Sequence, residues 1–437
     1  MKTVIFVYAG INFKDNYPCS WIPFSILSIA SVMPKNEYES IVFDGNRKDD
    51  NAFAELLLQK DVLAVAFSIM TGGDQIANTL DLALKVKQYN EKIVNIFGGP
   101  HVNVLPIQTL EHPLVDMVVV GPGQENFYEL IKAINNEANL SNINGVHYKL
   151  NGKIYSCLPP KPLKSLYPYD FSLININDYI QYDSTISDRT INYIASQGCV
   201  YACNFCYECT YKKRYYKVPI EYIEKDLFFF TQKYNVNGIK FYDADFFIDK
   251  NAAIAVSNML KEYGLKWAAS AHPLDILRAE KDGHNILLKN IKDSNCRRLL
   301  MGIESGSNRI LKEVINKRAS KEDILFVAKR IAEYGILGSY TFMLGLPNET
   351  NEEQDETFEF IEKLWELSPK PETNVHIYIP YPGTPLYKEA ISSGFIPPAK
   401  LEDWSSFNYY KAMTPWTSLE LEKRVHKFSS LINKKKQ

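Results

Sequence analysis

Residues 190–209 read TINYIASQGCVYACNFCYEC, an alternating apolar run that leads directly into a dense group of cysteines. Four of the seven cysteines in the 437-residue chain lie here, at Cys199, Cys203, Cys206 and Cys209. The first three have the spacing C-x-x-x-C-x-x-C, with which one loop can bind three corners of an iron–sulfur cube. A structural zinc site uses four ligands, commonly as two separated pairs, and the remaining cysteines form no second pair. The spacing therefore predicts an iron–sulfur cluster with one iron left open.

The apolar run before the cysteines is the first of several in the second half of the chain. From residue 190 onward, six strand-like runs alternate with helix-length segments, which predicts a β/α barrel or partial barrel. Such barrels place their chemistry at the carboxyl ends of the strands, so the cysteines are expected at the barrel mouth. The later runs end at Asp243, Asp245, His272, Glu304, Ser305, Gly345 and Tyr381.

The first 136 residues also alternate, with five β-branched runs separated by amphipathic segments: TVIFVYA, SIVFD, VLAVAFS, KIVNIFGG and DMVVVG. This pattern predicts a doubly wound α/β domain, an open parallel sheet with helices on both faces. Ligands of such sheets bind beyond the carboxyl ends of the strands, and glycine follows four of the five runs. The residues expected at this ligand site are Tyr8, Gly10, Ser68, Thr71, Gly98, Gly99, Pro100, His101, Gly121, Gly123 and Glu125.

Residues 141–189 have a different composition. An Asn-Gly pair between HYKL and KIYS predicts a hairpin turn, and the proline-rich LPPKPLKSLYPYDF that follows cannot continue a helix. We interpret this segment as a linker between a first domain at 1–140 and a barrel domain at 190–395. A short helical extension at 396–437 completes the predicted organisation.

Charge and hydropathy narrow the class of protein. Lysine and arginine total 49 against 51 acidic residues, so the net charge of −2 gives no general field for binding nucleic acid. Two basic runs, Lys212–Arg214 and Lys434–Lys436, are interpreted as charged surface. The sequence has no apolar run long enough for a membrane span, and MKTVIFVYA lacks the cleavage pattern of an export signal. With an odd cysteine count, these features favour a cytoplasmic protein.

Four motifs, in the order in which they occur, resemble those of the radical S-adenosylmethionine enzymes. They are CVYACNFC, which has an aromatic residue before its third cysteine, MGIESGSNRILK, FMLGLPNET and PYPGTPLY. The first half of the chain has GGPHVNVLP after its fourth run and a glycine-rich turn before Glu125. In this it is similar to the cobalamin-binding domain of the B12-dependent branch of that superfamily. The two resemblances together cover residues 1–395.

The resemblance implies three cofactors and a set of residues for each. Cys199, Cys203 and Cys206 would hold a 4Fe-4S cluster whose open iron binds S-adenosylmethionine, and Cys209 is expected not to be a ligand, because a fourth thiolate would close the cluster. The strand-end residues of the first domain would hold cobalamin. Two features depart from that family: the usual G-E-G-E is G-P-G-Q-E here, and no D-x-H-x-x-G supplies a histidine to the lower face of cobalt. The residues expected at S-adenosylmethionine are Phe205, Asp243, Asp245, Glu304, Ser305, Leu344 and Leu346.

The activity that the resemblance most directly implies is methyl transfer. In that interpretation a deoxyadenosyl radical takes hydrogen from an unactivated carbon of a small molecule or peptide, and methylcobalamin supplies a methyl group that originates from S-adenosylmethionine. An external reductant of flavodoxin or ferredoxin type would supply electrons, and no nucleic acid is expected as a partner. His272, His376, Tyr378 and Tyr381 are weak candidates on the substrate side, because each also fits a structural role.

Three other functions remain open to the sequence. The first is a cobalamin-containing radical enzyme that rearranges, contracts or dehydrates its substrate without methylating it. The second is a methylthiotransferase. Members of that class carry three further cysteines in the first domain, whereas this chain has only Cys19 before residue 150. The third is a carrier of cobalamin or of an iron–sulfur cluster, which the full set of barrel motifs disfavours.

Overall fold

The computed structural model describes residues 1–11, 21–211, 214–281, 286–407 and 413–434. Cys19 and the basic residues Lys212, Lys213, Lys435 and Lys436 lie outside these ranges. The chain divides into two compact units. The first comprises Met1–Tyr179 with Pro397–Asn408, and the second comprises Ile180–Ile396 with Tyr409–Gln437.

The first unit contains a seven-stranded sheet with the order β2-β1-β3-β4-β5-β6-β7. Strands β1 to β5 run parallel, and β6 and β7 add an antiparallel hairpin at one edge. The central strands β1 and β3 are buried along most of their length, as expected where helices cover both faces. The doubly wound α/β fold is confirmed. The strands are β1 (Lys2–Tyr8), β2 (Tyr38–Asp44), β3 (Val62–Ser68), β4 (Val94–Gly98), β5 (Met117–Val119), β6 (Val146–Leu150) and β7 (Lys153–Ser156).

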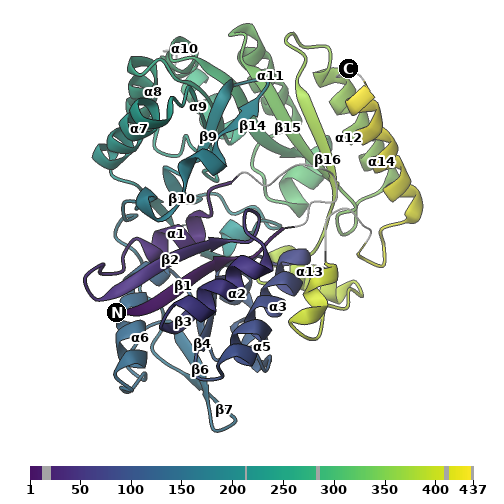
Figure 1. Cartoon of the computed structure of the whole chain (residues 1–437). Coiled ribbons are helices and arrows are strands. Elements are labelled where there is room, and N and C mark those ends of the chain that lie inside the picture. The colour runs from purple at the N-terminus through teal and green to yellow at the C-terminus, as the bar shows by residue number, and fades with distance from the viewer. Residues whose placement is uncertain (12–20, 212–213, 282–285, 408–412, 435–437) are drawn as a thin grey trace. The chain divides into compact units, whose positions relative to one another are not determined.

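The helices of the first unit lie on both faces of its sheet. The connection from β1 to β2 runs in the opposite direction along the sheet from the later connections, so right-handed crossovers place α1 opposite α2 and α3. Figure 1 shows α2, α3 and α5 together along one face. Because strands β1 to β5 are parallel, their carboxyl ends all lie at the same edge of the sheet. The helices are α1 (Phe24–Ala30), α2 (Asp50–Gln59), α3 (Asp74–Tyr89), α4 (Pro100–Val104), α5 (Pro106–Glu111) and α6 (Phe127–Asn135).

Two segments of the first unit differ from the division predicted from sequence. The Asn-Gly pair does form a turn, with φ of 51° at Asn151 and 74° at Gly152, but its hairpin pairs with β5 and extends the sheet into the expected linker. Residues 397–408, expected in the helical extension, belong to this unit, and we call them the strap. In the strap, Trp404 is fully buried and its indole donates to Gln108 Oε1 (2.7 Å). An exposed edge hairpin and a strap without periodicity both give weak sequence signals.

The second unit contains a seven-stranded sheet with the order β16-β15-β14-β13-β12-β9-β8. Six strands are parallel, and β8 pairs antiparallel with β9 at one edge. Because β16 and β8 do not pair with each other, the barrel is incomplete, which confirms the predicted partial barrel. The strands are β8 (Gln181–Asp183), β9 (Ser187–Tyr193), β12 (Gly238–Phe241), β13 (Lys266–Ser270), β14 (Cys296–Glu304), β15 (Leu337–Leu344) and β16 (Glu372–Ile377).

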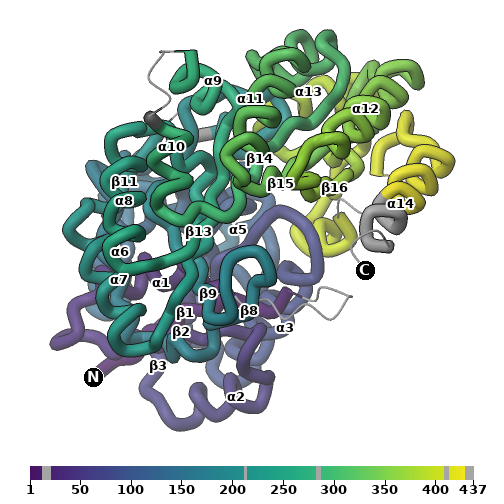
Figure 2. The backbone as a smooth tube through the Cα atoms, turned by 90° about the horizontal axis from the view of Figure 1, so that it is seen from above, coloured from purple at the N-terminus to yellow at the C-terminus, as the bar shows by residue number. Residues whose placement is uncertain are grey.

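Helices follow the parallel strands of the second unit in turn. Figure 2 shows α7, α8, α10, α11 and α12 one after another along this sheet. Within the ranges that the structure describes, no helix combines the length and apolarity needed to cross a membrane. The helices are α7 (Ile220–Tyr234), α8 (Lys250–Glu262), α9 (Pro273–Lys281), α10 (Ile286–Asp293), α11 (Lys321–Glu333), α12 (Asn351–Leu364), α13 (Pro385–Ser392) and α14 (Leu419–Lys434).

Candidate functional site

The cysteines lie on a loop whose two ends are held together by a short hairpin. Strand β10 (Ser196–Gly198) follows β9 and pairs antiparallel with β11 (Tyr215–Lys217). Gly198 has φ of 90°, and a Cβ atom there would lie 2.0 Å from the carbonyl oxygen of Arg214, so only glycine fits. The hairpin thus closes the base of residues 199–209, which we call the cysteine loop.

Hydrogen bonds of Asn204 fix the cysteine loop against two other strand-end segments. Its backbone N donates to Ile315 O (3.0 Å) and its side-chain amide donates to Val314 O (2.8 Å). Val314 ends a π-helical turn, Ile310–Val314, a rare conformation that occurs often at functional sites. The third bond runs from Leu386 N, which follows β16, to Asn204 O (3.1 Å). The loop is therefore anchored to segments that follow β14 and β16.

The three predicted cluster ligands lie close enough to influence one another's ionisation. Burial, and to a lesser extent the neighbouring Cys203 and Cys199, raise the pKa of Cys206 to about 12, and burial also raises the pKa of Cys199 to about 12. Buried, adjacent thiols ionise only when a cation compensates the charge, as the irons of a cluster do. In the described part of the chain, no three ligating side chains surround one position for a single ion. Three thiols on one loop with the spacing C-x-x-x-C-x-x-C are a donor set that fits an iron–sulfur cluster.

The other aromatic and sulfur groups of the loop lie beside these thiols. Cys209 N donates to Cys206 O (3.1 Å), and burial raises the pKa of the Cys209 thiol. Phe205 is half-buried. Burial, and after it the neighbouring Cys206, raise the pKa of Tyr381. The phenol that follows β16 therefore lies near the predicted cluster ligands. The exclusion of Cys209 from the cluster stays a prediction.

Glu304 ends β14 in a strained conformation. Its φ is 77°, which is rare for a residue with a side chain, and the pairing of β14 with β15 shifts register at this point. Its carboxylate folds back over Gly302, where a Cβ atom would lie 2.1 Å from Oε1. Lys317 Nζ lies 4.0 Å from the same oxygen, and both side chains are buried. Burial raises the pKa of Glu304, and Lys317 opposes this. Sequence reasoning missed Lys317, since no spacing links it to Glu304.

The two aspartates after β12 have different surroundings. Asp243 Oδ1 accepts from Ser196 Oγ (2.5 Å) and Oδ2 accepts from Ala195 N (3.1 Å), while burial raises its pKa to about 6. Asp245 uses Oδ1 for Phe247 N (3.0 Å), but its buried Oδ2 has no donor among the residues described. Asp243 therefore supports the strand that leads into the cysteine loop, whereas Asp245 keeps one oxygen for another partner.

A second carboxyl group, that of Asp275 on α9, is close enough to influence Asp245 electrostatically. Burial and then Asp275 raise the pKa of Asp245 well above its usual range. Tyr201 of the cysteine loop donates to Asp275 Oδ1 (2.7 Å) and stacks on His272 with ring centroids 3.7 Å apart. His272 Nδ1 accepts from Leu274 N (3.2 Å), which leaves the proton on Nε2, and burial lowers the pKa of the ring to about 2. Neither Tyr201 nor Asp275 had been predicted.

The remaining predicted residues of the second unit are mostly buried. Ser305 is fully buried, and its hydroxyl interacts with Thr357 Oγ1 (3.2 Å). Leu344 and Leu346 are also fully buried at the end of β15. Tyr378 is 1% exposed and its hydroxyl has no partner in the described ranges. His376 is half-buried, and burial lowers its pKa.

In the first unit, the carboxyl edge of the sheet combines tight glycine turns with unsatisfied polar atoms. A Cβ atom at Gly99 would lie 2.8 Å from Ile69 O and from Ser68 Oγ, and φ there is 93°. Thr71 Oγ1 is buried without a partner in the part of the chain that the structure covers, as are both ring nitrogens of His101. The orphaned hydroxyl of Thr71 fits a polar ligand at this edge. His101 itself is enclosed, with its ring 5.5 Å from that of Trp404, and burial lowers its pKa to about 4.

The turn after β5 is held by residues of the first unit itself. Gly121 has φ of 82°, and a Cβ atom there would lie 2.5 Å from Pro160 Cβ. Glu125 Oε1 accepts from Tyr167 of the proline-rich segment (3.2 Å). The other predicted cobalamin residues lie at or directly beyond the carboxyl ends of their strands: Tyr8, Gly10, Ser68, Gly98, Pro100 and Gly123.

Two family models match the two halves of the chain. The B12 binding domain matches residues 15–131, and the Radical SAM superfamily matches residues 193–361. A solved structure with the same fold is the radical S-adenosylmethionine methyltransferase TsrM from Kitasatospora setae, with a TM-score of 0.69 and 16% identity. The alignment covers 90% of this chain and 77% of that one.

Three relatives match across most of this chain. A Pyrococcus horikoshii protein named an uncharacterized methyltransferase is 29% identical, covering 93% of this chain and 86% of the relative. The anaerobic magnesium-protoporphyrin IX monomethyl ester cyclase of Rubrivivax gelatinosus is 22% identical, covering 87% and 67%. The cytidylyl-2-hydroxyethylphosphonate methyltransferase of Streptomyces wedmorensis is 21% identical, covering 91% and 83%.

The matched domains occur in the order that the sequence motifs predicted, and the fold of each unit agrees with its domain. The radical SAM domain brings a 4Fe-4S cluster and S-adenosylmethionine, and the B12 domain brings cobalamin. The chain belongs to the cobalamin-dependent radical S-adenosylmethionine enzymes.

Proposed function

We propose that the protein is a methyltransferase that moves a methyl group from S-adenosylmethionine, by way of cobalamin, to an unactivated carbon of its substrate. The observation that carries the proposal is the match of both units to a relative named a methyltransferase over 93% of this chain. A second relative named a methyltransferase, that of Streptomyces wedmorensis, matches over 91% of this chain and supports the same reaction. When bound, the cluster with S-adenosylmethionine supplies radical chemistry and cobalamin carries the methyl group.

The second unit would hold the cluster and S-adenosylmethionine. Cys199, Cys203 and Cys206 bind the irons, which is supported by their mutual proximity and burial. Glu304, held by its positive φ and by Lys317, hydrogen-bonds the ribose or methionyl part. Phe205 offers its backbone to adenine, and Leu344, Leu346 and Ser305 complete the pocket.

Between the two aspartates, Asp245 is the group proposed to bind the methionine ammonium. Its buried Oδ2 has no donor within the described residues and is therefore available to a protonated amine. Both oxygens of Asp243 already accept hydrogen bonds from Ala195 and Ser196. Asp243 is therefore a positioning residue for the cysteine loop.

The first unit would bind cobalamin along the carboxyl edge of its sheet. Gly99 and Gly121 make the tight, closely packed turns that shape this edge, and Thr71 Oγ1 is available to a polar substituent. His101 is enclosed by Trp404 of the strap and therefore shapes the turn after β4 without reaching cobalt.

A small molecule or peptide is the substrate class that we propose, with no nucleic acid partner, because the near-neutral net charge of −2 gives no general field that would attract a nucleic acid. His272, Tyr378 and Tyr381 are the substrate-side candidates; the hydroxyl of Tyr378 and Nε2 of His272 lack partners within the described ranges. A flavodoxin or ferredoxin would supply electrons. The six described cysteines are free thiols, which supports a reducing compartment such as the cytoplasm.

The test is anaerobic reconstitution with iron, sulfide and cobalamin, followed by reaction with S-adenosylmethionine labelled in its methyl group. Candidate small molecules and peptides are offered under reduction, and products are analysed by mass spectrometry. Label in a product, together with deoxyadenosine, supports the proposal. A converted substrate that carries no label would contradict methyl transfer and favour rearrangement, ring contraction or dehydration.

A further inference from the structure

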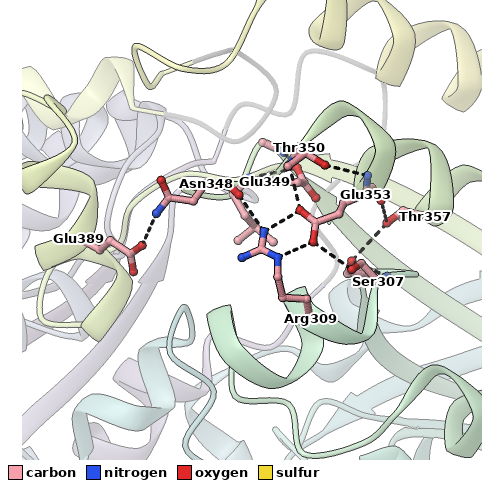
Figure 3. Close-up of polar contacts among 11 residues, drawn as sticks. Ser307, Arg309, Asn348, Glu349, Thr350, Glu353, Thr357 and Glu389 are labelled. Atoms are coloured by element: carbon pink, nitrogen blue, oxygen red, sulfur yellow. Dashed lines mark hydrogen bonds and ion pairs between the residues drawn. The ribbon is translucent and has the colours of Figure 1, made fainter.

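Arg309, five residues after Glu304, forms a two-pronged ion pair with Glu353 on the first turn of α12. Its Nε and Nη2 donate to Glu353 Oε1 (2.7 Å) and Oε2 (2.6 Å), as Figure 3 shows. Glu353 also completes a capping box, because its carboxylate accepts from Thr350 N (3.0 Å). Bidentate pairs of this kind are geometrically specific. The pair thus joins the loop after β14 to the start of α12.

The same first turns of α12 hold the backbone next to Glu304. Thr357 Oγ1 accepts from Gly306 N (2.9 Å), and Ser307 Oγ donates to Glu353 Oε1 (3.1 Å). A Cβ atom at Gly306 would lie 2.4 Å from Glu356 O, so loop and helix are in direct backbone contact. Residues 304–307, which we call the carboxylate loop, are therefore clamped on α12. This clamp stabilises the unfavourable φ of Glu304.

Arg309 also reaches the loop that follows β15. Its Nη2 donates to Asn348 O (2.8 Å), and Asn348 has φ of 59°. The next residue, Glu349, accepts from Gly345 N (2.6 Å) and Leu346 N (3.3 Å). Arg309 consequently connects the two segments proposed to face S-adenosylmethionine: it reaches the carboxylate loop through Glu353, and residues 344–346 through the loop that contains Asn348 and Glu349.

A second arginine pair on α12 shows what is distinctive about this arrangement. Arg424 of α14 binds Asp355 (2.5 Å), and both arginines have 40% of their side chains exposed. The carboxylate partner is 57% exposed in Asp355 but only 10% exposed in Glu353. Exposed pairs contribute little to stability, whereas a carboxylate with four donors in a buried turn fixes geometry. Arg424 is therefore a matched control.

We propose that Arg309 and Glu353 are positioning residues for S-adenosylmethionine, which they serve by locking the carboxylate loop and the loop after β15 in one arrangement. The inference rests on the proposed function, since it takes these loops as the S-adenosylmethionine pocket. Neither side chain needs to contact the ligand. Their loss should weaken binding because Glu304 is no longer held at the required φ.

The experiment compares Arg309→Ala, Arg309→Lys, Glu353→Gln and Arg424→Ala with the wild type, all as anaerobically reconstituted full-length protein. Iron per chain and thermal unfolding are measured first. The dissociation constant of S-adenosylmethionine comes from equilibrium dialysis, and the change in the electron paramagnetic resonance signal of the reduced cluster on ligand addition reports its environment. Deoxyadenosine formation then separates KM from kcat. Glu353→Gln is milder than Arg309→Ala. It leaves only a partly solvated guanidinium unpaired, whereas Arg309→Ala leaves the buried carboxylate of Glu353 without its partner.

We expect Arg309→Ala and Glu353→Gln to raise the dissociation constant and KM by roughly 10- to 100-fold, with unchanged iron content. Arg309→Lys should fall between them and the wild type, since it keeps the charge but not the two-pronged geometry. Arg424→Ala should behave as the wild type. Variants with full iron and wild-type affinity would overturn the inference, and so would a loss of thermal stability without a change in affinity of the folded fraction. If the wild type itself neither binds nor cleaves S-adenosylmethionine, the proposed function fails instead.

Discussion

Gly198→Ala is expected to cost the protein its cluster while leaving most of the fold in place. A non-glycine residue at a φ of 90° costs about 1–2 kcal/mol. The new Cβ would lie 2.0 Å from Arg214 O, an oxygen of the backbone, and relieving such an overlap in a packed site adds about 1–3 kcal/mol. The total of roughly 2–5 kcal/mol falls on a hairpin of only three residue pairs, in which each hydrogen bond contributes about 1 kcal/mol. The hairpin should therefore open.

An open hairpin no longer holds Cys199 in place relative to the other ligands. Iron per chain after reconstitution should fall well below that of the wild type, and a chelator should remove the remainder roughly tenfold faster or more, because 1.4 kcal/mol already corresponds to a factor of ten. Iron analysis and the loss of cluster absorbance measure both. The matched control is Gly152→Ala, where φ is 74° but no atom lies within 4 Å of the added Cβ. A Gly198→Ala protein with full iron and wild-type resistance to chelation would refute the reasoning.

Three further outcomes follow from the structure. Cys206→Ala should lose the cluster absorbance, whereas Cys209→Ala should keep it together with the iron content; a cluster lost in both variants would make Cys209 a ligand. Burial raises the pKa of Asp226 to about 7, above an unfolded value near 4, so this carboxyl destabilises the fold as pH rises from about 4 through 7. Asp226→Asn, which keeps an acceptor for Tyr193, should therefore raise the melting temperature at pH 8 and leave it unchanged at pH 4; an equal shift at both pH values would contradict this. Trp404→Ala removes a fully buried ring and should destabilise the first unit by about 3–5 kcal/mol, measured by denaturant unfolding, and a change below 1 kcal/mol would show that the strap contributes little.

Both sheets could be predicted from the sequence because most of their parallel strands are short, largely buried apolar runs that alternate with amphipathic helical segments. The β6–β7 hairpin was predicted only as a turn, since the side chains of β7 are exposed and carry no alternation. The strap was expected in a separate helical extension for a similar reason: its anchor, Trp404, is one aromatic residue in an aperiodic segment.

The residues of the candidate site also fall into two groups, those that the sequence could predict and those that it could not. The cysteine ligands are specified by spacing within one loop, and Glu304 by its motif. Lys317, Asp275 and Tyr201 become visible only in three dimensions, because they meet Glu304, Asp245 and His272 across segments far apart in the chain. The difference between Asp243 and Asp245 was also beyond the sequence, since it depends on which oxygens already accept hydrogen bonds.

The strap has a consequence for any experiment that separates or exchanges the two halves. Because Trp404 fills its place beside His101 and Gln108 from the far end of the chain, a fragment ending at Tyr179 would lack part of its own interior. Such a fragment would expose an apolar hollow and be prone to aggregate. A chimera that grafts this cobalamin domain onto another barrel must also include residues 397–408. The first domain therefore has to be transferred as two separate segments of sequence.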